Sequence, residues 1–282
     1  MSRTRIPSER YDRQYFASEA CPGFEIYLAN GLPHLELHEA VLKLAGLRED
    51  DAVLDFGAGR GEFTLACAAR ARQSIGIDYA RAALEYASRG KRAIGAPVAQ
   101  CAHFIRSAAG PLPLRSSSLD VIFMLDVIEH LDAEEVATTL REFHRVLRPG
   151  GRLVVHTPNR WDYDIAWPYW GYFVSAGVRL FTGRRPAIGR NKRIPAELEF
   201  HINEQSPPQL RDSLRAAGFA RVRVFPRTLL GSSRRSLRGL YVMVAQYLRP
   251  LSLLPPLSQI FNHSLLAVAV KARSDLRETR RD

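Results

Sequence analysis

The 282-residue chain has few cysteines and no long apolar run. Its three cysteines, Cys21, Cys67 and Cys101, are odd in number and far apart, which argues against a disulfide framework or a cysteine-based metal site. No apolar stretch reaches the ~18 residues that a membrane span needs, and the first residues lack the apolar segment of a secretory signal. These absences predict a cytoplasmic protein with reduced thiols.

Acidic residues are scarce in the last third of the chain. Residues 1–178 have a formal charge of −2 and residues 179–282 have +13, which together give the net charge of +11. Such asymmetry indicates an anionic partner surface, and a solvated arginine-rich surface is an equally good interpretation. The sequence also lacks a His/Cys/Asp cluster with the spacing of a metal site, so we expect no metal.

What the chain does have is a glycine-rich loop between a predicted strand and a predicted helix. The loop reads Asp55-Phe56-Gly57-Ala58-Gly59-Arg60-Gly61, which is the spacing D-x-G-x-G-x-G. Alternate glycines let a backbone turn sharply and approach a ligand closely, and a helix start presents unpaired N–H groups. The dinucleotide fingerprint has the different spacing G-x-G-x-x-G. A leading carboxylate suits a cationic ligand better than a pyrophosphate.

Three further segments follow the glycine-rich loop in order. Residues 73–78 read as a strand that ends in Asp78, residues 119–130 as a strand followed by Asp126 to His130, and residues 143–155 as a helix, a Pro-Gly-Gly turn and another strand. Together the four segments resemble the class I S-adenosylmethionine (SAM)-dependent methyltransferases of the methyltransferase-11 group. The core is similar to that of the ubiquinone-pathway O-methyltransferases. The resemblance is strong over residues 50–160 and weaker towards the C-terminus.

The resemblance and the alternation of strands and helices imply an α/β fold. We expect a Rossmann-like, doubly wound sheet of seven strands, mostly parallel with an antiparallel last strand. Strands are predicted near 52–56, 73–78, 102–106, 119–125, 151–157, 221–226 and 264–271, and helices near 34–46, 61–71, 79–89, 133–147 and 207–217. The expected parts are cap helices in 1–48, a SAM-binding core in 49–158, an insertion in 159–205, and the rest of the sheet in 206–282 with a second insertion near 228–262.

The resemblance also implies that SAM is the methyl donor and S-adenosylhomocysteine the product. Carried over position by position, it assigns cofactor binding to Asp55, Gly57, Gly59, Gly61, Asp78, Tyr79, Leu125, Asp126, Tyr11 and Tyr15. Asp55 and the loop glycines would hold the methionine part, Asp78 the ribose hydroxyls, and Leu125 with Asp126 the methionine amine.

Aromatic residues have less definite roles in this scheme. Tyr79 would pack on the adenine, while Tyr11 and Tyr15 would close over the cofactor or simply pack as ordinary aromatic side chains. The family often has an acid after the third strand that binds the adenine amino group. Residues 104–109 contain none, so Ser107 or a backbone carbonyl would substitute.

A general base is needed only if the acceptor is a poorly acidic hydroxyl. His130, His156 and His201 are the candidates, because the pKa of histidine suits proton transfer near neutral pH. For His130 the alternative is a structural hydrogen-bonded pair with Glu129. The implied reaction is direct displacement, which needs no catalytic triad and no metal.

The resemblance implies a small-molecule or lipid-linked acceptor, methylated at a hydroxyl. Two alternatives are an RNA methyltransferase and a non-catalytic SAM-fold module that binds a partner. Nucleic acid is disfavoured because Asp126 to Glu129 stand where amino-methylating nucleic-acid enzymes have an N-P-P-Y type motif.

Two segments of the sequence suggest a membrane contact. Residues 161–193 combine aromatic side chains with a basic run, and residues 234–257 add a second basic and apolar stretch. The pattern predicts docking on an anionic membrane at its inner face. A buried aromatic lid over a soluble acceptor is an equal alternative. No pattern in the sequence indicates an oligomeric state.

Overall fold

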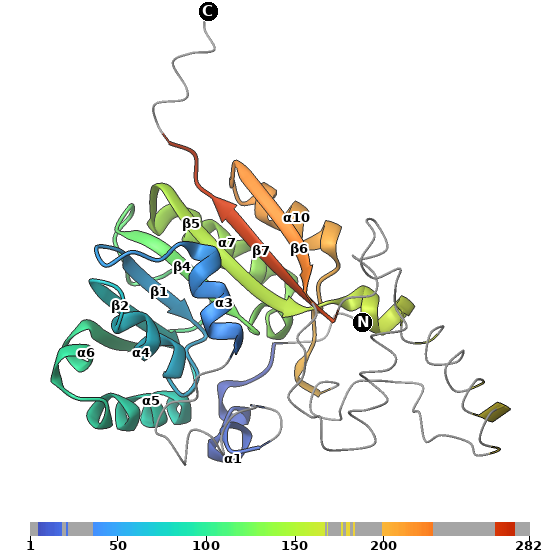
Figure 1. Ribbon diagram of the computed structural model, residues 1–282, viewed down its shortest axis with the longest axis horizontal. Helices are drawn as coiled ribbons and strands as arrows, with labels where there is room; N and C mark the ends of the chain where they lie inside the picture. Colours follow the sequence, from blue (N-terminus) through green and yellow to red (C-terminus); the bar gives the residue numbers. More distant parts are fainter. Residues whose placement is uncertain are drawn as a thin grey trace, which may run out of the picture.

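A seven-stranded sheet forms the centre of the molecule, with the strand order β3-β2-β1-β4-β5-β7-β6 (Figure 1). The computed structural model describes residues 5–18, 21, 36–166, 168, 176, 179–180, 183, 199–227 and 263–273. The strands are β1 (Ala52–Phe56), β2 (Gln73–Asp78), β3 (Ala102–Arg106), β4 (Leu119–Leu125), β5 (Leu147–Pro158), β6 (Arg221–Arg227) and β7 (Ser264–Val270). The first five strands pair in parallel, and β7 is antiparallel to β5 and β6. The predicted Rossmann-like sheet is confirmed.

Helices connect the strands and cover both faces of the sheet. In the described part of the chain they are η1 (Ser8–Arg10), α1 (Arg13–Phe16), α3 (Glu36–Ala45), α4 (Glu62–Ala68), α5 (Arg81–Ala93), α6 (Ala96–Cys101), η2 (Ile128–His130), α7 (Ala133–Val146), η3 (Asp162–Ala166) and α10 (Pro207–Ala216). Figure 1 shows α3 in front of the sheet and α7 and α10 behind it. Side chains of α3 and α4 pack on one face, and side chains of α7 and α10 pack on the other.

Burial on both faces explains why the central strands are so apolar. All five residues of β1 are buried, and β4 is buried from Val121 to Met124. Parallel strands covered by helices on both sides have near-continuous apolar sequences rather than alternating ones. The side chains of Phe56 and Phe143 meet edge to face with ring centroids 5.0 Å apart, which joins β1 to α7.

Several element bounds differ from those expected. β5 begins at Leu147, before the Pro-Gly-Gly turn, because the turn is accommodated as an irregularity in the β4–β5 pairing. α4 ends at Ala68, α5 extends to Ala93, and the short helix α6 was not expected. The expected second insertion near 228–262 and most of the first lie outside the described residues.

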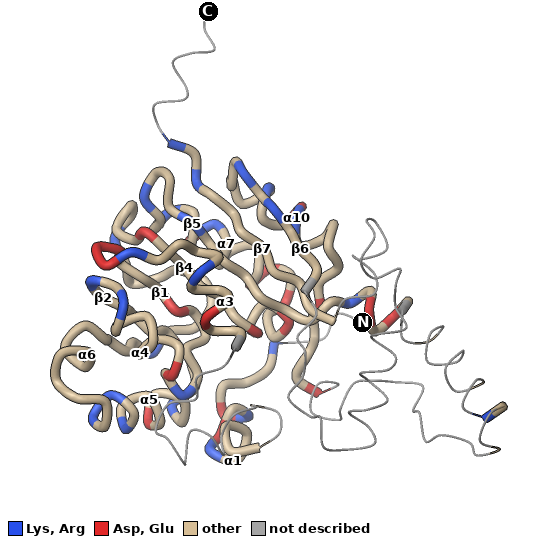
Figure 2. The backbone as a smooth tube through the Cα atoms, viewed as in Figure 1, with Lys and Arg blue, Asp and Glu red and all other residues tan. Residues whose placement is uncertain are grey.

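The described residues contain no helix that is both long enough and apolar enough to cross a membrane. Basic residues of the C-terminal third occur within the described part of the chain on α10, on β6 and just after β7, and Figure 2 shows Lys and Arg on α10 as well as on α5. The segment 234–257 and most of 161–193, on which the membrane prediction depends, are not among the described residues.

Candidate active site

The carboxyl ends of β1, β2, β4 and β5 meet at one edge of the sheet. β1 pairs with β2 on one side and with β4 on the other, so the order of the strands along the chain changes direction there. In open α/β sheets, ligands bind outside the carboxyl ends of the strands at such a switch point. The glycine-rich loop follows β1 at this position and is therefore the natural floor of a binding site.

Each glycine of the loop has its own reason to lack a side chain. Gly57, Gly59 and Gly61 all have positive φ, at 81°, 53° and 84°. A Cβ at Gly57 would lie 2.2 Å from Val127, and one at Gly61 would lie 2.7 Å from Ala87, so both are fixed by packing inside the protein. At Gly59 the nearest atom would be a ring carbon of Phe16, 3.8 Å away. Gly59 is thus the glycine beside which there is room for a ligand.

Asp78 connects the loop to the end of β2. Its carboxylate accepts hydrogen bonds from the backbone N–H of Gly59 at 2.9 Å and of Ala80 at 2.8 Å. Burial raises the pKa of Asp78, and the backbone hydrogen bonds partly offset that effect. A carboxylate can accept further hydrogen bonds beyond these two, so Asp78 keeps the capacity to bind hydroxyl groups of a ligand.

Asp55 lies beneath the loop at the end of β1. It is 3% exposed, and the Thr64 hydroxyl donates to it at 2.6 Å. Burial raises the pKa of Asp55 to about 7, with the Thr64 hydrogen bond opposing and the nearby Asp78 charge adding to the rise. A cation nearby would stabilise the charged form of this buried carboxyl group. The hydrogen bond from Thr64 was not predicted from the sequence.

Asp126 and His156 form a pair across the ends of β4 and β5. The Asp126 Oδ1 to His156 Nδ1 distance is 2.7 Å, and the Asp126 N–H donates to the His156 carbonyl at 3.0 Å. Asp126 has φ of 53°, which is unusual for a residue other than glycine and often marks a functional site. The Asp126 side chain is half exposed. Partial desolvation tends to raise the pKa of Asp126, but the interaction with His156 holds that pKa below its usual value.

Glu129 and His130, the alternative structural pair, have separate hydrogen-bond partners within the described part of the chain. Glu129 is fully buried, and its Oε2 accepts a hydrogen bond from Thr157 at 3.0 Å. His130 Nδ1 lies 3.0 Å from the Phe200 carbonyl and 3.1 Å from the Tyr11 hydroxyl. Burial, with the Asp126 charge, raises the pKa of Glu129 to about 7. Burial, with the nearby His201, lowers the pKa of His130 to about 4, so this ring is neutral at neutral pH.

His201 joins this group from a distant part of the sequence. Its ring lies edge to face with that of His130, with centroids 5.1 Å apart, and its Nδ1 is 3.3 Å from Glu204 Oε1. Two backbone N–H groups of the same segment, those of Ile202 and Asn203, donate to the Glu129 carbonyl at 2.9 Å. All three candidate bases therefore lie near the ends of β4 and β5.

The described residues of the N-terminus, 5–18 and 21, form a strap along the mouth of the site. Tyr11 is at the centre of an aromatic cluster, with ring centroids 4.8 Å from Tyr15, 5.4 Å from Tyr79 and 5.1 Å from Phe200. Burial raises the pKa of Tyr11 and of Tyr15, so both phenols stay protonated. Tyr79 packs on Tyr11, and its hydroxyl donates to the Ile6 carbonyl at 3.4 Å.

Arg60 holds the strap against the glycine-rich loop, a role that sequence reasoning missed. Its guanidinium is 3% exposed and donates to the carbonyls of Phe16 at 2.8 Å and Cys21 at 3.0 Å, while Glu62 pairs with it at 2.5 Å. A charged residue inside a glycine-rich loop was the available signal. Phe200 was also missed, because its place beside Tyr11 depends on tertiary contacts between segments far apart in the chain.

Ser107, which follows the third strand, was expected to bind the adenine amino group, and its present contacts are with the protein backbone. Its N–H donates to the Asp78 carbonyl at 3.0 Å, and its hydroxyl contacts the neighbouring Ala108 carbonyl at 3.4 Å. The place of Ser107 beside Asp78 is compatible with the expected substitution, which remains a prediction.

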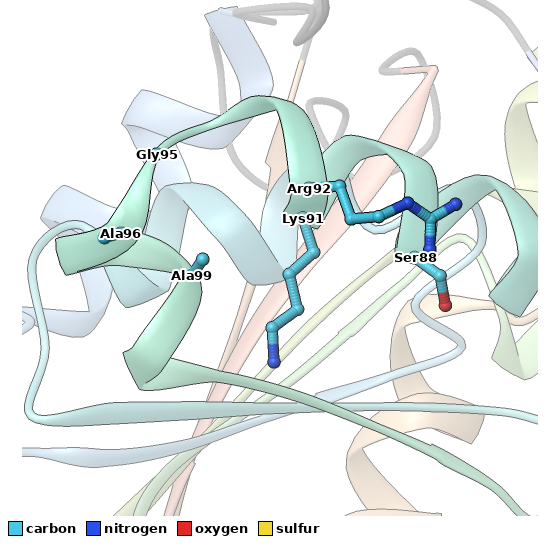
Figure 3. Close-up of a pocket in the computed structure, with 6 residues that line it drawn as sticks. All are labelled: Ser88, Lys91, Arg92, Gly95, Ala96 and Ala99. Atoms are coloured by element: carbon cyan, nitrogen blue, oxygen red, sulfur yellow. The ribbon is translucent and has the colours of Figure 1, made fainter.

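A cavity of about 420 Å³ lies away from this site, between the end of α5 and the start of α6 (Figure 3). Ser88, Lys91, Arg92, Gly95, Ala96 and Ala99 line it. α5 runs back from the carboxyl edge after Asp78, so its end lies towards the opposite edge of the sheet. Lys91 donates to the Ala102 carbonyl at 2.6 Å, which gives it a structural role at the start of β3.

Comparison with known proteins agrees with the geometry. Residues 54–155 match the family model described as "Methyltransferase domain". A probable S-adenosylmethionine-dependent methyltransferase of Mycolicibacterium smegmatis is 36% identical over 183 residues, which cover 64% of this chain and 57% of that protein. A ubiquinone biosynthesis O-methyltransferase of Pseudomonas aeruginosa is 32% identical over 108 residues, which cover 38% of this chain and 44% of that protein.

Solved structures extend the similarity of fold to nearly the whole chain. The crystal structure of the [4+2]-cyclase SpnF superimposes with a TM-score of 0.61 at 18% identity, over 97% of this chain and all of that one. The curated relatives above are matched over about half of their length. SAM is the cofactor of the matching family, and methyl transfer in that family needs no metal. Residues 54–155 are thus a methyltransferase domain similar to those of SAM-dependent methyltransferases, and they form the centre of a fold that extends over nearly the whole chain.

Proposed function

We propose that this protein transfers the methyl group of SAM by direct displacement to a hydroxyl of a small-molecule or lipid-linked acceptor. The observation that carries the proposal is the link between Asp78 and Gly59, which places a buried carboxylate beside an open stretch of glycine-rich loop at the sheet's switch point. The similarity to a protein named as a ubiquinone biosynthesis O-methyltransferase supports a hydroxyl acceptor.

The residues at the site fit SAM by their chemistry. SAM carries an ammonium and a sulfonium, and the loop is surrounded by the buried carboxyl groups of Asp55 and Asp78 with Asp126 nearby. Asp55 and the loop backbone would hold the methionine part, and Asp78 the ribose. The Leu125 carbonyl and Asp126 would face the amine. Tyr15 and Tyr79 would exclude water from above.

When bound, SAM supplies a methyl group on a sulfur that is already positively charged. The protein therefore needs mainly to orient the acceptor, exclude water and remove one proton. Among the three histidines we assign the base to His156, because its Nδ1 is held by Asp126 at 2.7 Å. An anionic carboxylate on Nδ1 fixes the tautomer that leaves Nε2 as the basic nitrogen. His130 and His201 would position the acceptor and the strap.

The raised pKa of Asp55 predicts pH-dependent cofactor binding. The carboxyl has a pKa of about 7 without ligand and must lose its proton to pair with an ammonium, so SAM binding should tighten as pH rises towards 7. Below that pKa the association constant should change by up to about tenfold per pH unit. Isothermal titration in buffers of different ionisation enthalpy should show proton release. Asp55→Asn should remove this pH dependence of the SAM association constant, whereas Asp212→Asn, at an exposed position, should leave it intact. An unchanged pH dependence in Asp55→Asn would refute the role of Asp55 in binding the ammonium.

The assignment of the base predicts a selective loss of turnover. With labelled SAM and fractionated cell extract, label should enter a lipid, glycan or small-molecule fraction. Label in RNA alone would favour the nucleic-acid alternative.

The labelled fraction then serves as the substrate for testing the base. With it, His156→Gln should lower kcat by about 10²–10⁴-fold with SAM affinity unchanged. His144→Gln on α7, far from the site, is the control. Equal turnover in His156→Gln and the control would exclude His156 as the base.

We further infer that residues 161–193 and 234–257 contact an anionic membrane surface, from which a lipid-linked acceptor would enter. The support within the described residues is local: Leu180 is 80% exposed, Ile165 is 39% exposed, and Arg179 is exposed. Apolar side chains beside arginines are typical of interfacial segments. Tyr163, by contrast, is buried against His263 and cannot contribute.

Liposome co-sedimentation tests the membrane contact. Binding should increase with the fraction of anionic lipid and decrease with salt, because each arginine near the surface contributes about 1 kcal/mol of attraction. Replacing Trp167 and Trp170 by Ala should reduce binding, while the buried core change Val154→Ala should not alter the lipid dependence of the folded protein. Wild-type protein that stays in the supernatant at low salt would point to a soluble acceptor instead.

A further inference from the structure

We propose that Glu129, His130 and His201 bind one divalent transition-metal ion of the zinc type, which fastens the segment 199–205 to the end of β4. Glu129 and His130 lie on η2 directly after β4, and His201 lies 71 residues further along the chain. One ligand atom from each side chain comes within 4.8 Å of those from the other two. The inference goes beyond the proposed methyl transfer and does not depend on it.

The outer partners of the two imidazoles are those that metal-binding histidines usually have. His130 Nδ1 faces the Phe200 carbonyl at 3.0 Å, and His201 Nδ1 faces the Glu204 carboxylate at 3.3 Å. An N–H donated to a carbonyl or carboxylate fixes the tautomer, so the unprotonated nitrogen of each ring is Nε2. The Tyr11 hydroxyl, 3.1 Å from His130 Nδ1, adds a second contact on the same side of that ring.

Glu129 supplies an independent indication of a missing ligand. Its side chain is fully buried, and within the described part of the chain its Oε1 has no hydrogen-bond partner, while Oε2 accepts from Thr157. An unpartnered carboxylate oxygen in a protein interior is costly unless it meets a cation or a donor. A metal ion between Glu129 and the two histidines would satisfy that oxygen.

The donor set selects the kind of metal. Two imidazoles and one carboxylate suit Zn²⁺ and similar ions, whereas Mg²⁺ and Ca²⁺ prefer sites made of oxygen ligands. Bonds of about 2.0–2.1 Å to a tetrahedral Zn²⁺ place the ligand atoms about 3.4 Å apart. The side chains would therefore have to draw together from their present spacing, and a fourth position would remain for water.

The position of the site predicts a structural effect. The segment 199–205 is already attached to η2 by the hydrogen bonds of Ile202 and Asn203 to the Glu129 carbonyl. Phe200 of the same segment packs on Tyr11 of the strap. A metal bound to His201 would add a further attachment, and it would hold this side of the site closed. Methyl transfer itself requires no metal, so the ion would restrain the site rather than take part in the reaction.

Metal titration of the untagged, chelator-treated full-length chain tests the proposal. Calorimetry with Zn²⁺ should show one equivalent bound, and Zn²⁺ should raise the melting temperature. Glu129→Gln and His201→Gln should each weaken binding at least about tenfold. The exposed His103→Gln on β3 is the matched control and should bind like wild type. Cobalt substitution should give a visible spectrum without the thiolate charge-transfer band expected if the cysteines were the ligands.

Two results would overturn the metal site: no Zn²⁺ binding by the wild-type chain, or binding that is equal in wild type, Glu129→Gln and His201→Gln. Circular dichroism of each variant shows whether it is folded, and the partly exposed His201→Gln decides the matter if the buried Glu129→Gln unfolds. SAM binding and methyl transfer measured in EDTA are separate readouts. A wild-type chain that transfers methyl groups but binds no Zn²⁺ would reject the metal site alone, and one that binds Zn²⁺ through these residues but transfers no methyl group would reject only the proposed function.

Discussion

Two hydrogen bonds to the Asp78 carboxylate hold the candidate site in shape. They connect the end of β2 to the N–H groups of Gly59 and Ala80, so the glycine-rich loop and the start of α5 both depend on this carboxylate. The loop also donates two hydrogen bonds, from the N–H groups of Gly57 and Ala58 to the Ile77 carbonyl. A loop fixed in this way can leave Gly59 open to a ligand without collapsing onto it.

The charge arrangement around the loop follows from burial. Asp55, Asp78 and Glu129 are all removed from water, and burial raises the pKa of each. Arg60 is also buried, but it is committed to Glu62 and to backbone carbonyls of the strap. The site is therefore short of positive charge, which makes a cationic cofactor its natural complement. The strap covers the site with aromatic side chains that exclude water, and it does not provide a positive charge to balance the carboxyl groups.

Local sequence patterns predicted most of the sheet and the cofactor loop. The expected strands at 52–56, 73–78, 102–106 and 119–125 have the observed bounds. Strands of a parallel sheet that is covered by helices on both faces are apolar along their length, so the glycine and charged residues that flank each apolar run mark where the strand begins and ends. The start of β5 was missed because Pro149-Gly150-Gly151 has the composition of a turn, and only pairing with β4 and β7 shows that the strand continues through it. α6 was missed because it is short and contains Pro97.

The acceptor side of the site could not be predicted in the same way. His130 and His201 are 71 positions apart, and no local pattern signals that the turn after Phe200 returns to η2. The Asp126–His156 pair likewise depends on the register between β4 and β5, in which Leu125 faces His156. Individual candidates were identified from residue type and strand position, whereas their grouping required the fold.

Calorimetric titration of SAM into the wild-type chain and into Asp78→Ala, with Asp212→Ala as the control, tests the cofactor site most directly. SAM should bind the wild type and Asp212→Ala alike, with NAD showing no binding. Binding to folded Asp78→Ala should be weaker by about 1–3 kcal/mol, the loss expected for charge-assisted hydrogen bonds. Equal SAM affinity in all three proteins, or preferential binding of NAD, would contradict the placement of the cofactor at the end of β2.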